Sequence, residues 1–394
     1  MDNQVQYNWI VSEPAAWPPR TRPTAPFGVS AVEVARSCPL RLCFEASKSQ
    51  GYEPRSGFAG HVGIAFHRTL QSLYDSPMPR GISPSEAASR ARDRFRRAMA
   101  EREAIRQQRP REQRLPQDQE RVHRAVEAIM LEARRLVESG LADTLCRGSA
   151  GVAAARDNDS SEGRRIEVEV SVASQDNLLA GRIDRVEYTP DTVCLVDYKS
   201  AFRDDLPERY ERQLQLYAWL WHESRGLWPT EAYVAYPFTA TTHPVEVEPE
   251  MCSRVAKESK QIIEQFEDVA STGGLGTPGE VCQVCEFRPW CNSFWDYQAS
   301  SKSHREALER ARHGFQGEVA ELLESDHYWR LAIQWRSSSV TIVSPVERFP
   351  QLRFASPGMT VRALDMRLRG HMFQPRASVT DWSEIFIVLD RQGE

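Results

Sequence analysis

The sequence predicts a mixed α/β domain followed by a small all-β domain. Three consecutive strand candidates lie among helical segments in the first 298 residues, and residues 83–139 form a long helical stretch rich in Arg, Glu and Gln. From residue 315 onward the pattern changes to five short β segments. Strands that alternate with helices indicate a mixed sheet covered by helices, whereas a series of short strands is typical of a barrel or a sandwich.

The N-terminal part of the chain is expected to begin with a flexible tail over residues 1–25, since four prolines lie between positions 14 and 23. Short and amphipathic helices are predicted over residues 27–45 and 60–74. Pro110 and Pro116 should split the 83–139 stretch into two helices, because proline cannot continue an α-helix. This stretch is interpreted as a helical insertion.

The central part carries the strand candidates, which cover residues 164–174, 178–188 and 192–201. The last two are joined through "TPD", a turn signal. A helix over 209–224, a strand over 230–238 and a helix over 250–271 should follow. A charged helical linker over 299–314 then leads to the β domain at 315–394.

Bulk composition is that of a soluble globular protein, with 41% hydrophobic and 27% charged residues and a formal net charge of −5. No run is apolar enough to span a membrane and the start shows no signal pattern, so a cytoplasmic protein is expected. Two zones are nevertheless basic: residues 90–135 hold 14 Arg against 8 acidic residues, and residues 330–376 hold 8 against 2. They make a polyanion a candidate partner, although a solvated helix face would explain the first zone.

The segment "CLVDYKSA" places charges inside an apolar strand. Residues two apart on a strand point to the same face, so Asp197 and Lys199 project together. Asp184 lies on the preceding strand and is likewise embedded among apolar residues. Two carboxylates and a lysine that converge in this way suit a Mg²⁺ site, since Mg²⁺ prefers oxygen ligands. The alternative is a simple salt bridge on a half-buried strand.

Residues on neighbouring helices strengthen the metal-site interpretation. Gln213 and Tyr217 are four apart and therefore share one helix face. His67 lies on the helix over 60–74, with Gly63 one turn earlier. A single helical histidine is usually structural, but here it belongs to a set.

The segments "GIAFH", "GRIDRVEY", "VDYKS" and "QLQLY" occur in this order. Together they resemble the PD-(D/E)XK nucleases of the RecB/AddB type, a group that includes CRISPR-associated exonucleases. The family pattern is a histidine, an aspartate, a D/E-x-K and a helical Q-x-x-x-Y. The resemblance implies a restriction-endonuclease-like nuclease domain over residues 26–298.

The resemblance also implies a role for each matching residue. His67, Asp184 and Asp197 would bind Mg²⁺ or Mn²⁺, and Tyr198 would offer its backbone carbonyl to the metal. Lys199 would be the catalytic lysine. The remaining two positions, Gln213 and Tyr217, would support the site and contact DNA.

Three cysteines, Cys282, Cys285 and Cys291, follow the spacing C-x₂-C-x₅-C and need a fourth ligand from elsewhere. The spacing does not separate zinc from iron–sulfur, and frequency alone favours zinc. The family resemblance implies instead a 4Fe–4S cluster completed by a remote N-terminal cysteine. Cys38, in "SCPLR", resembles that ligand better than its competitor Cys43.

The other cysteines, Cys146, Cys194 and Cys252, are expected to be small buried apolar residues.

The C-terminal β segments favour a small barrel over another β domain, and an OB-fold is the favoured version of it. Such barrels bind single strands through a basic groove and stacking aromatics. The aromatic residues of this region could serve that purpose, or they could form the core of a barrel without a ligand.

These features predict a metal-dependent DNA nuclease that acts on single-stranded DNA or DNA ends in repair, recombination or defence. The chain has no P-loop motif, which suggests a helicase or other DNA-processing partner. The main alternative is a non-catalytic DNA-binding or assembly subunit with the same fold. A zinc-containing protein with another enzymatic role is the third hypothesis.

Overall fold

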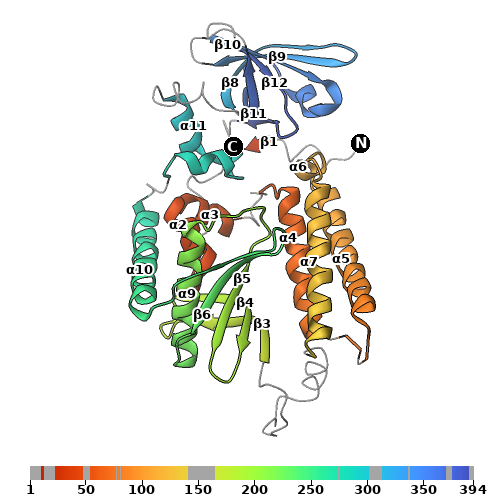
Figure 1. The fold of residues 1–394 in the computed structure, drawn as a ribbon. Coiled ribbons are helices and arrows are strands. Elements are labelled where there is room, and N and C mark those ends of the chain that lie inside the picture. Colours follow the sequence, from red (N-terminus) through yellow and green to blue (C-terminus); the bar gives the residue numbers. More distant parts are fainter. Residues whose placement is uncertain are drawn as a thin grey trace.

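The chain folds into an α/β domain and a β domain that contact each other (Figure 1). The computed structural model describes residues 10–12, 23–47, 54–76, 78–79, 81–140, 165–272, 276–300, 313–335, 338–369 and 375–389. Among these residues, no helix combines the length and the apolar character that crossing a membrane would require.

The α/β domain is built on a mixed sheet in the order β3–β4–β5–β6–β7. Its strands are β3 (Arg165–Ala173), β4 (Leu179–Tyr188), β5 (Val193–Tyr198), β6 (Glu231–Tyr236) and β7 (Thr241–Pro244), and the short β2 (Phe27–Gly28) pairs with the start of β4. β5 and β6 run parallel, joined by helix α9 (Glu208–Arg225). Gly226 ends α9 in the left-handed conformation, at φ 73°, which glycine adopts without strain.

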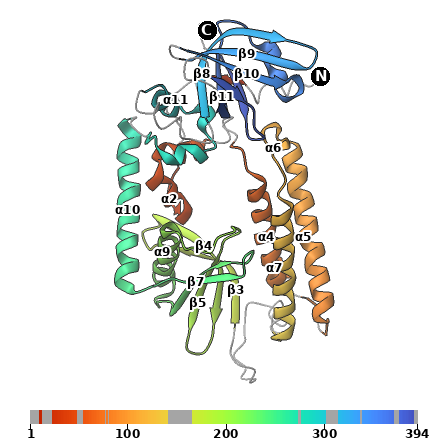
Figure 2. The ribbon, with the colours of Figure 1, turned by 45° about the horizontal axis from the view of Figure 1, so that its top comes forward.

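Helices cover both faces of this sheet (Figures 1 and 2). On one side α9 packs on the strands, together with α2 (Val29–Ser37), α3 (Pro39–Ala46) and α10 (Pro249–Thr272). On the other side lie α4 (Phe58–Asp75), α5 (Pro84–Gln107) and α7 (Gln119–Glu138). Each face has its own apolar core: Leu195 points to the α9 side and its neighbour Val196 to the α4 side.

The predicted break of the 83–139 stretch at its prolines is confirmed. Helix α5 ends at Gln107, the one-turn helix α6 (Pro110–Gln113) follows, and α7 begins after Asp118. Ser83 caps α5 by accepting a hydrogen bond from the Glu86 N–H at 3.2 Å, and Asp118 caps α7 by accepting one from the Arg121 N–H at 2.9 Å.

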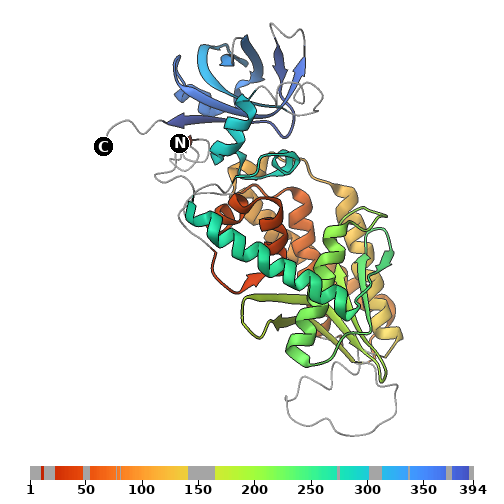
Figure 3. The same ribbon diagram turned by 90° about the vertical axis from the view of Figure 1, so that its left-hand side faces the viewer.

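The C-terminal domain contains the predicted small barrel, which has five strands and is closed (Figure 3). The ring runs β8 (His313–Glu324), β9 (Tyr328–Trp335), β10 (Ser338–Pro345), β12 (Arg376–Ser378) and β11 (Thr360–Arg369), and β11 pairs back to β8. Four of the five predicted segments lie in this ring. The fifth, β13 (Glu384–Leu389), pairs with β11 outside it, and the three-residue β12 takes its place.

The barrel aromatics divide between core and surface. Trp329 and Phe349 are fully buried in the barrel core, as the alternative without a ligand expects. Tyr328 and Phe354 are exposed, at 54% and 52%. Neither hypothesis therefore accounts for all the aromatic residues.

The predicted N-terminal tail includes a strand, β1 (Ile10–Ser12), which pairs in parallel with β13. One edge of β13 pairs with β11. The other edge lies outside the barrel, where β1 provides hydrogen-bond partners for its backbone. The β domain begins at residue 313, two residues before the predicted boundary. The preceding helix α11 (Asn292–Ala299) overlaps the start of the predicted linker, most of which lies outside the described residues.

Buried charges join the two domains. Arg111 of α6 forms two parallel hydrogen bonds to Glu384 of β13, at 2.9 and 3.1 Å. Arg288 makes the same paired contact with Asp365 of β11, at 3.1 and 3.0 Å. Arg55 lies between the two carboxylates, 3.3 Å from each. All five side chains are less than a tenth exposed as residues, so breaking the set would leave charges buried without partners.

We predict that Glu384→Gln destabilises the protein by about 3–5 kcal/mol, because Arg111 and Arg55 would lose a buried counter-charge. The measurement is urea unfolding of the full chain. Glu324→Gln is the matched control: its partner Arg353 and Glu324 itself are both exposed, so the cost should stay below about 1 kcal/mol. Equal effects of the two substitutions would contradict the prediction.

The pH dependence follows from the same contacts. Although burial acts in the opposite direction, the guanidinium groups of Arg111 and Arg55 hold the pKa of Glu384 below its ordinary value. A lowered folded-state pKa means that this contribution to stability is fully present above the ordinary pKa of a glutamate. It is lost only as the pH falls through the lower folded-state value.

Candidate active site

A cavity of about 320 Å³ brings together residues from helices α4 and α9, from the middle of β4 and from the end of β5. The sequence-predicted site residues all line it: His67, Asp184, Asp197, Tyr198, Lys199, Gln213 and Tyr217. The remaining lining residues are Ser200, Ala201 and Tyr210. Residues that are 150 positions apart in the chain therefore share one small pocket.

Antiparallel pairing of β4 with β5 places the two aspartates beside each other. Arg185 pairs with Val196, and Asp184 and Asp197 are the next residues outward on the two strands. The backbone N–H of Tyr198 donates a hydrogen bond to Asp184 Oδ2 at 2.7 Å, which fixes that carboxylate. The Tyr198 side chain points to the opposite face of the sheet, where it packs in the α4–α7 core.

Lys199 follows the end of β5 and connects the strand to helix α9. Its Nζ lies 2.7 Å from Asp197 Oδ2 and donates to Gln213 Oε1 at 2.8 Å. Gln213 Nε2 in turn donates to the other oxygen of Asp197 at 3.4 Å. Nζ also lies 4.6 Å from the ring centroid of Tyr210, a favourable cation–π contact. The lysine head group is thus held in one position beside the carboxylates.

His67, on the sheet-facing side of α4, approaches the same carboxylate pair. Its Nδ1 is 3.7 Å from Asp184 Oδ1. One ligand atom each of His67, Asp184 and Glu169 lies within 4.8 Å of the others. Among the described residues, this is the group of three or more His, Cys, Asp or Glu side chains that fits one metal ion.

Glu169 is the site residue that sequence reasoning missed. It lies on β3 between Val168, which pairs with Arg185, and Val170, which pairs with Ile183, and it has a positive φ of 54°. The strand changes its facing at this residue: Val168 packs on the α4–α7 core and Val170 on the α9 core. The alternating sequence "IEVEVSV" gives no sign of this change of facing.

The carboxylates are crowded and poorly hydrated. Burial raises the pKa of Asp184 to about 7, and the charge of Asp197 adds to the shift. Burial also raises the pKa of Glu169 and lowers the pKa of His67. A neutral imidazole and carboxylates that repel one another form a donor set that a divalent cation would stabilise.

These residues fit Mg²⁺ or Mn²⁺. The donors are hard carboxylate oxygens with one imidazole nitrogen, and the cavity leaves room for water ligands. Asp197 stands next to this group, but its two oxygens are engaged by Lys199 and Gln213.

Two glycines allow the site elements to approach each other. A Cβ on Gly63 of α4 would lie 2.6 Å from Ser200 Oγ, and one on Gly181 of β4 would lie 2.5 Å from the ring of Tyr217. Both distances are well below van der Waals contact. The glycines in the "GIAFH" and "GRID" segments therefore let α4 and α9 close on the strand ends.

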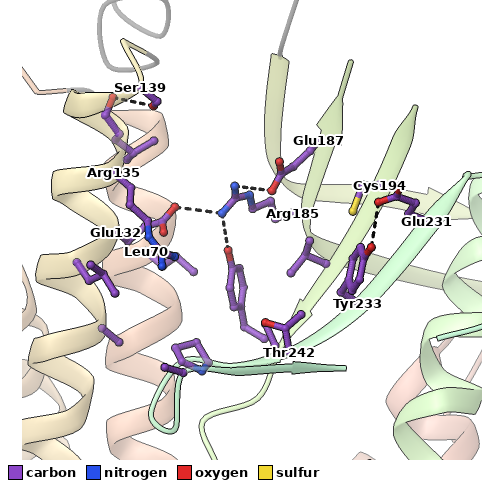
Figure 4. A pocket seen from close by; sticks show the side chains of 18 of the residues that line it. Leu70, Glu132, Arg135, Ser139, Arg185, Glu187, Cys194, Glu231, Tyr233 and Thr242 are labelled. Atoms are coloured by element: carbon purple, nitrogen blue, oxygen red, sulfur yellow. Dashed lines mark hydrogen bonds and ion pairs between the residues drawn. The ribbon is translucent and has the colours of Figure 1, made fainter. Parts of the chain in front are cut away.

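A second, larger cavity of about 1150 Å³ lies on the opposite face of the same strands (Figure 4). At its wall Arg185 donates to Glu132 of α7 at 3.0 Å and to the Tyr198 hydroxyl at 2.8 Å, and it forms an ion pair with Glu187. Arg185 and Tyr198 are the chain neighbours of Asp184 and Asp197. Their side-chain contact therefore holds β4 and β5 together directly behind the two aspartates.

The cysteines predicted to bind a cluster also come together. Cys38, between α2 and α3, and the segment 282–291 pack on the same edge of the α9-side core, and all four thiols are partly buried. Burial raises the pKa of Cys285 to about 11 and that of Cys291 to about 12, and the neighbouring thiols add to both shifts. Backbone N–H groups point at the sulfurs: Gly279 donates to Cys282 at 3.5 Å and Phe294 to Cys291 at 3.4 Å.

The remaining described cysteines differ from this set. Cys43 and Cys252 are fully buried in the core, as predicted for Cys252. Cys194 is half-buried at the wall of the larger cavity rather than fully buried. Cys146 lies outside the described residues.

Solved structures with detectable similarity include a replication factor A related protein from Methanobacterium thermoautotrophicum, 17% identical, which covers 21% of this chain and 86% of its own with a TM-score of 0.19. The protein SSO0001 is 13% identical, covers 59% and 95%, and has a TM-score of 0.24. A murine DNA binding protein bound with double-stranded DNA is 9% identical, covers 59% and 98%, and has a TM-score of 0.21. These similarities are too weak to bear on the fold or the function of this chain.

A comparison with curated proteins gives no match. The family comparison is decisive, because the model described as the PD-(D/E)XK nuclease superfamily matches residues 26–292. That range includes the β4–β5 aspartates, Lys199, α9 and the cysteine segment. The chain belongs to the PD-(D/E)XK nuclease superfamily.

Proposed function

We propose that this protein is a Mg²⁺- or Mn²⁺-dependent deoxyribonuclease that acts on single-stranded DNA or DNA ends. The observation that carries the proposal is the contact set around Lys199, which lies within 2.8 Å of both Asp197 and Gln213. Asp184 and His67 line the same pocket, and Glu169 lies beside these two residues. Every position of the D-(x)n-D-x-K pattern holds the residue type that the pattern requires: Asp184, Asp197 and Lys199.

Asp184, Glu169 and His67 would hold the metal, with Asp197 next to them. A bound divalent cation polarises the phosphodiester and lowers the pKa of a bound water. Lys199 Nζ can donate a hydrogen bond to the attacking water or to a phosphate oxygen and offset the negative charge that develops there. Gln213 and Asp197 keep this ammonium in place, so its position does not depend on the substrate.

We further propose a 4Fe–4S cluster held by Cys38, Cys282, Cys285 and Cys291. Tetrahedral zinc, with Zn–S distances of about 2.3 Å, would bring its thiolates to about 3.8 Å from one another. No three of these four described thiols lie within 4.8 Å of one another, a separation that favours a larger inorganic group. Backbone N–H donors at the sulfurs support thiolate ligands. Such ligands also favour a reducing, cytoplasmic environment.

We predict that Lys199→Ala lowers the rate of Mn²⁺-dependent cleavage of labelled single-stranded DNA by at least about 100-fold, because the transition state loses a fixed cation. Lys257→Ala, at an exposed site on α10, is the control and should cleave like the unaltered protein. Cleavage is measured with Mn²⁺, with Mg²⁺ and with EDTA.

The same assay tests the alternative hypothesis. DNA binding without metal-dependent cleavage, in protein with intact metal content, would contradict the enzymatic proposal. It would favour the non-catalytic DNA-binding or assembly subunit.

We predict that protein purified without oxygen contains iron and acid-labile sulfide, and that Cys38→Ala removes most of both. Cys43→Ala should keep them, because Cys43 is buried in the core and is not part of the four-thiol set. Elemental analysis gives the result. Zinc in place of iron, or loss of iron in Cys43→Ala but not in Cys38→Ala, would contradict the cluster assignment.

A further inference from the structure

The outer face of the barrel carries four exposed arginines on three of its strands: Arg330 on β9, Arg367 and Arg369 on β11, and Arg376 on β12. Within the described part of the chain, none of the four has an ion pair or hydrogen bond with another side chain. Exposed arginines of the helices α4 and α5 do form such pairs: Arg68 pairs with Glu101 and Arg90 with Glu86.

Strand register shows that these arginines share one surface. Arg369 is directly opposite Arg376, and Arg367 is opposite Ser378. Ser378 pairs with Val343 of β10, which pairs with Arg330. Directly paired residues point to the same side of a sheet, so this row crosses β11, β12, β10 and β9. We call Arg330, Arg367, Arg369 and Arg376 the arginine face.

Apolar side chains on the same surface remain in water. Val343 is 53% exposed between the arginines, and Leu323, opposite Arg330 on β8, is 48% exposed. Tyr328 precedes Arg330 by two residues on β9, so it projects from the same side, and it is 54% exposed. The inward-facing neighbours Trp329 and Leu331 already fill the core, so the fold does not need these exposed side chains.

Acidic residues are nearly absent from this surface. The two rows of paired residues that contain the arginines include one carboxylate, Glu321, at the β8 edge. Four unpaired guanidinium groups repel one another, and a fold gains nothing from placing them together. A polyanion would relieve this repulsion and release its own counterions.

We propose that the arginine face binds the phosphate backbone of single-stranded nucleic acid, with Tyr328 as a stacking platform for a base. The inference rests on the proposed nuclease function and assigns a strand-holding surface to the β domain. Guanidinium groups suit phosphates, and an exposed aromatic ring beside them suits unpaired bases rather than a closed duplex.

The test compares two triple variants of the full chain. One is Arg330→Gln, Arg367→Gln and Arg376→Gln; the other is Arg96→Gln, Arg97→Gln and Arg134→Gln, which removes the same charge from exposed, unpaired arginines of α5 and α7. Fluorescence anisotropy measures affinity for a labelled single-stranded oligonucleotide in EDTA over a range of salt concentrations. Thermal unfolding checks that both variants fold.

The arginine-face variant should lose affinity, and its slope of log K against log salt should be less negative by about 0.7 for each phosphate contact removed, or about 2 in total. The helical variant should keep the original slope. Tyr328→Ala should weaken binding at least about fivefold with the slope unchanged, because stacking is not a charge effect.

An unchanged slope in the arginine-face variant, or an equal change in both triple variants, would overturn the proposal. So would an absence of single-strand binding by the unaltered protein, which would instead favour an acidic protein partner. Because binding is measured without metal, the result is separate from cleavage. If the protein cleaves DNA but the arginine-face substitutions leave binding unchanged, only this inference is refuted. If the protein binds single strands through the arginine face but does not cleave them, only the nuclease function is refuted.

Discussion

The burial of two carboxylates side by side is the constraint that organises the α/β domain. Asp184 and Asp197 meet because β4 pairs with β5, and burial together with the charge of Asp197 raises the pKa of Asp184. Their neighbours offset this cost: the Tyr198 N–H holds one carboxylate, and Lys199 with Gln213 holds the other. A stable fold would not require such an arrangement, since apolar residues could occupy both positions at lower cost. The sheet therefore holds two carboxylates that repel each other at the place where a divalent cation would be most strongly attracted.

Both domains use the same backbone device to direct an acidic side chain. Glu169 and Asp365 are non-glycine residues at positive φ, 54° and 56°. In β3 the pairing register with β4 is unbroken, and one ligand atom of Glu169 lies within 4.8 Å of ligand atoms of His67 and Asp184. In β11 the pairing with β8 shifts its register around Asp365, which is 1% exposed and accepts hydrogen bonds from Arg288 and Arg55. The positive φ thus interrupts the extended backbone of each strand at an acidic residue that faces other ionisable side chains.

The sequence alone was enough to predict the structure wherever a local pattern was supported by matching residues elsewhere in the chain. The strands around Asp184 and Asp197 and the α9 face with Gln213 are arranged as the motifs predicted. Cys38 packs with the 282–291 segment, as the family resemblance implied. Glu169 was missed because the strand changes its facing there through a positive φ, which period-two alternation cannot show. The exchange of β12 for β13 in the barrel ring was missed because only the three-dimensional pairing decides which segment closes the ring.

The interdomain charges connect the cysteine segment to the barrel. Arg288 lies between Cys285 and Cys291, and its side chain spans to Asp365, while its Nε donates to the Cys285 carbonyl at 3.0 Å. Nearby, Arg362 of β11 donates to the Pro289 carbonyl at 2.7 Å. The backbone that positions these thiols is therefore held from the barrel side as well as by the α9-side core. Because the contacts are buried and charged, the barrel cannot separate from the cysteine segment without exposing Asp365 and losing Arg288 as its partner. The β domain is consequently a structural support of the cysteine segment, and the buried contacts fix its position next to that segment.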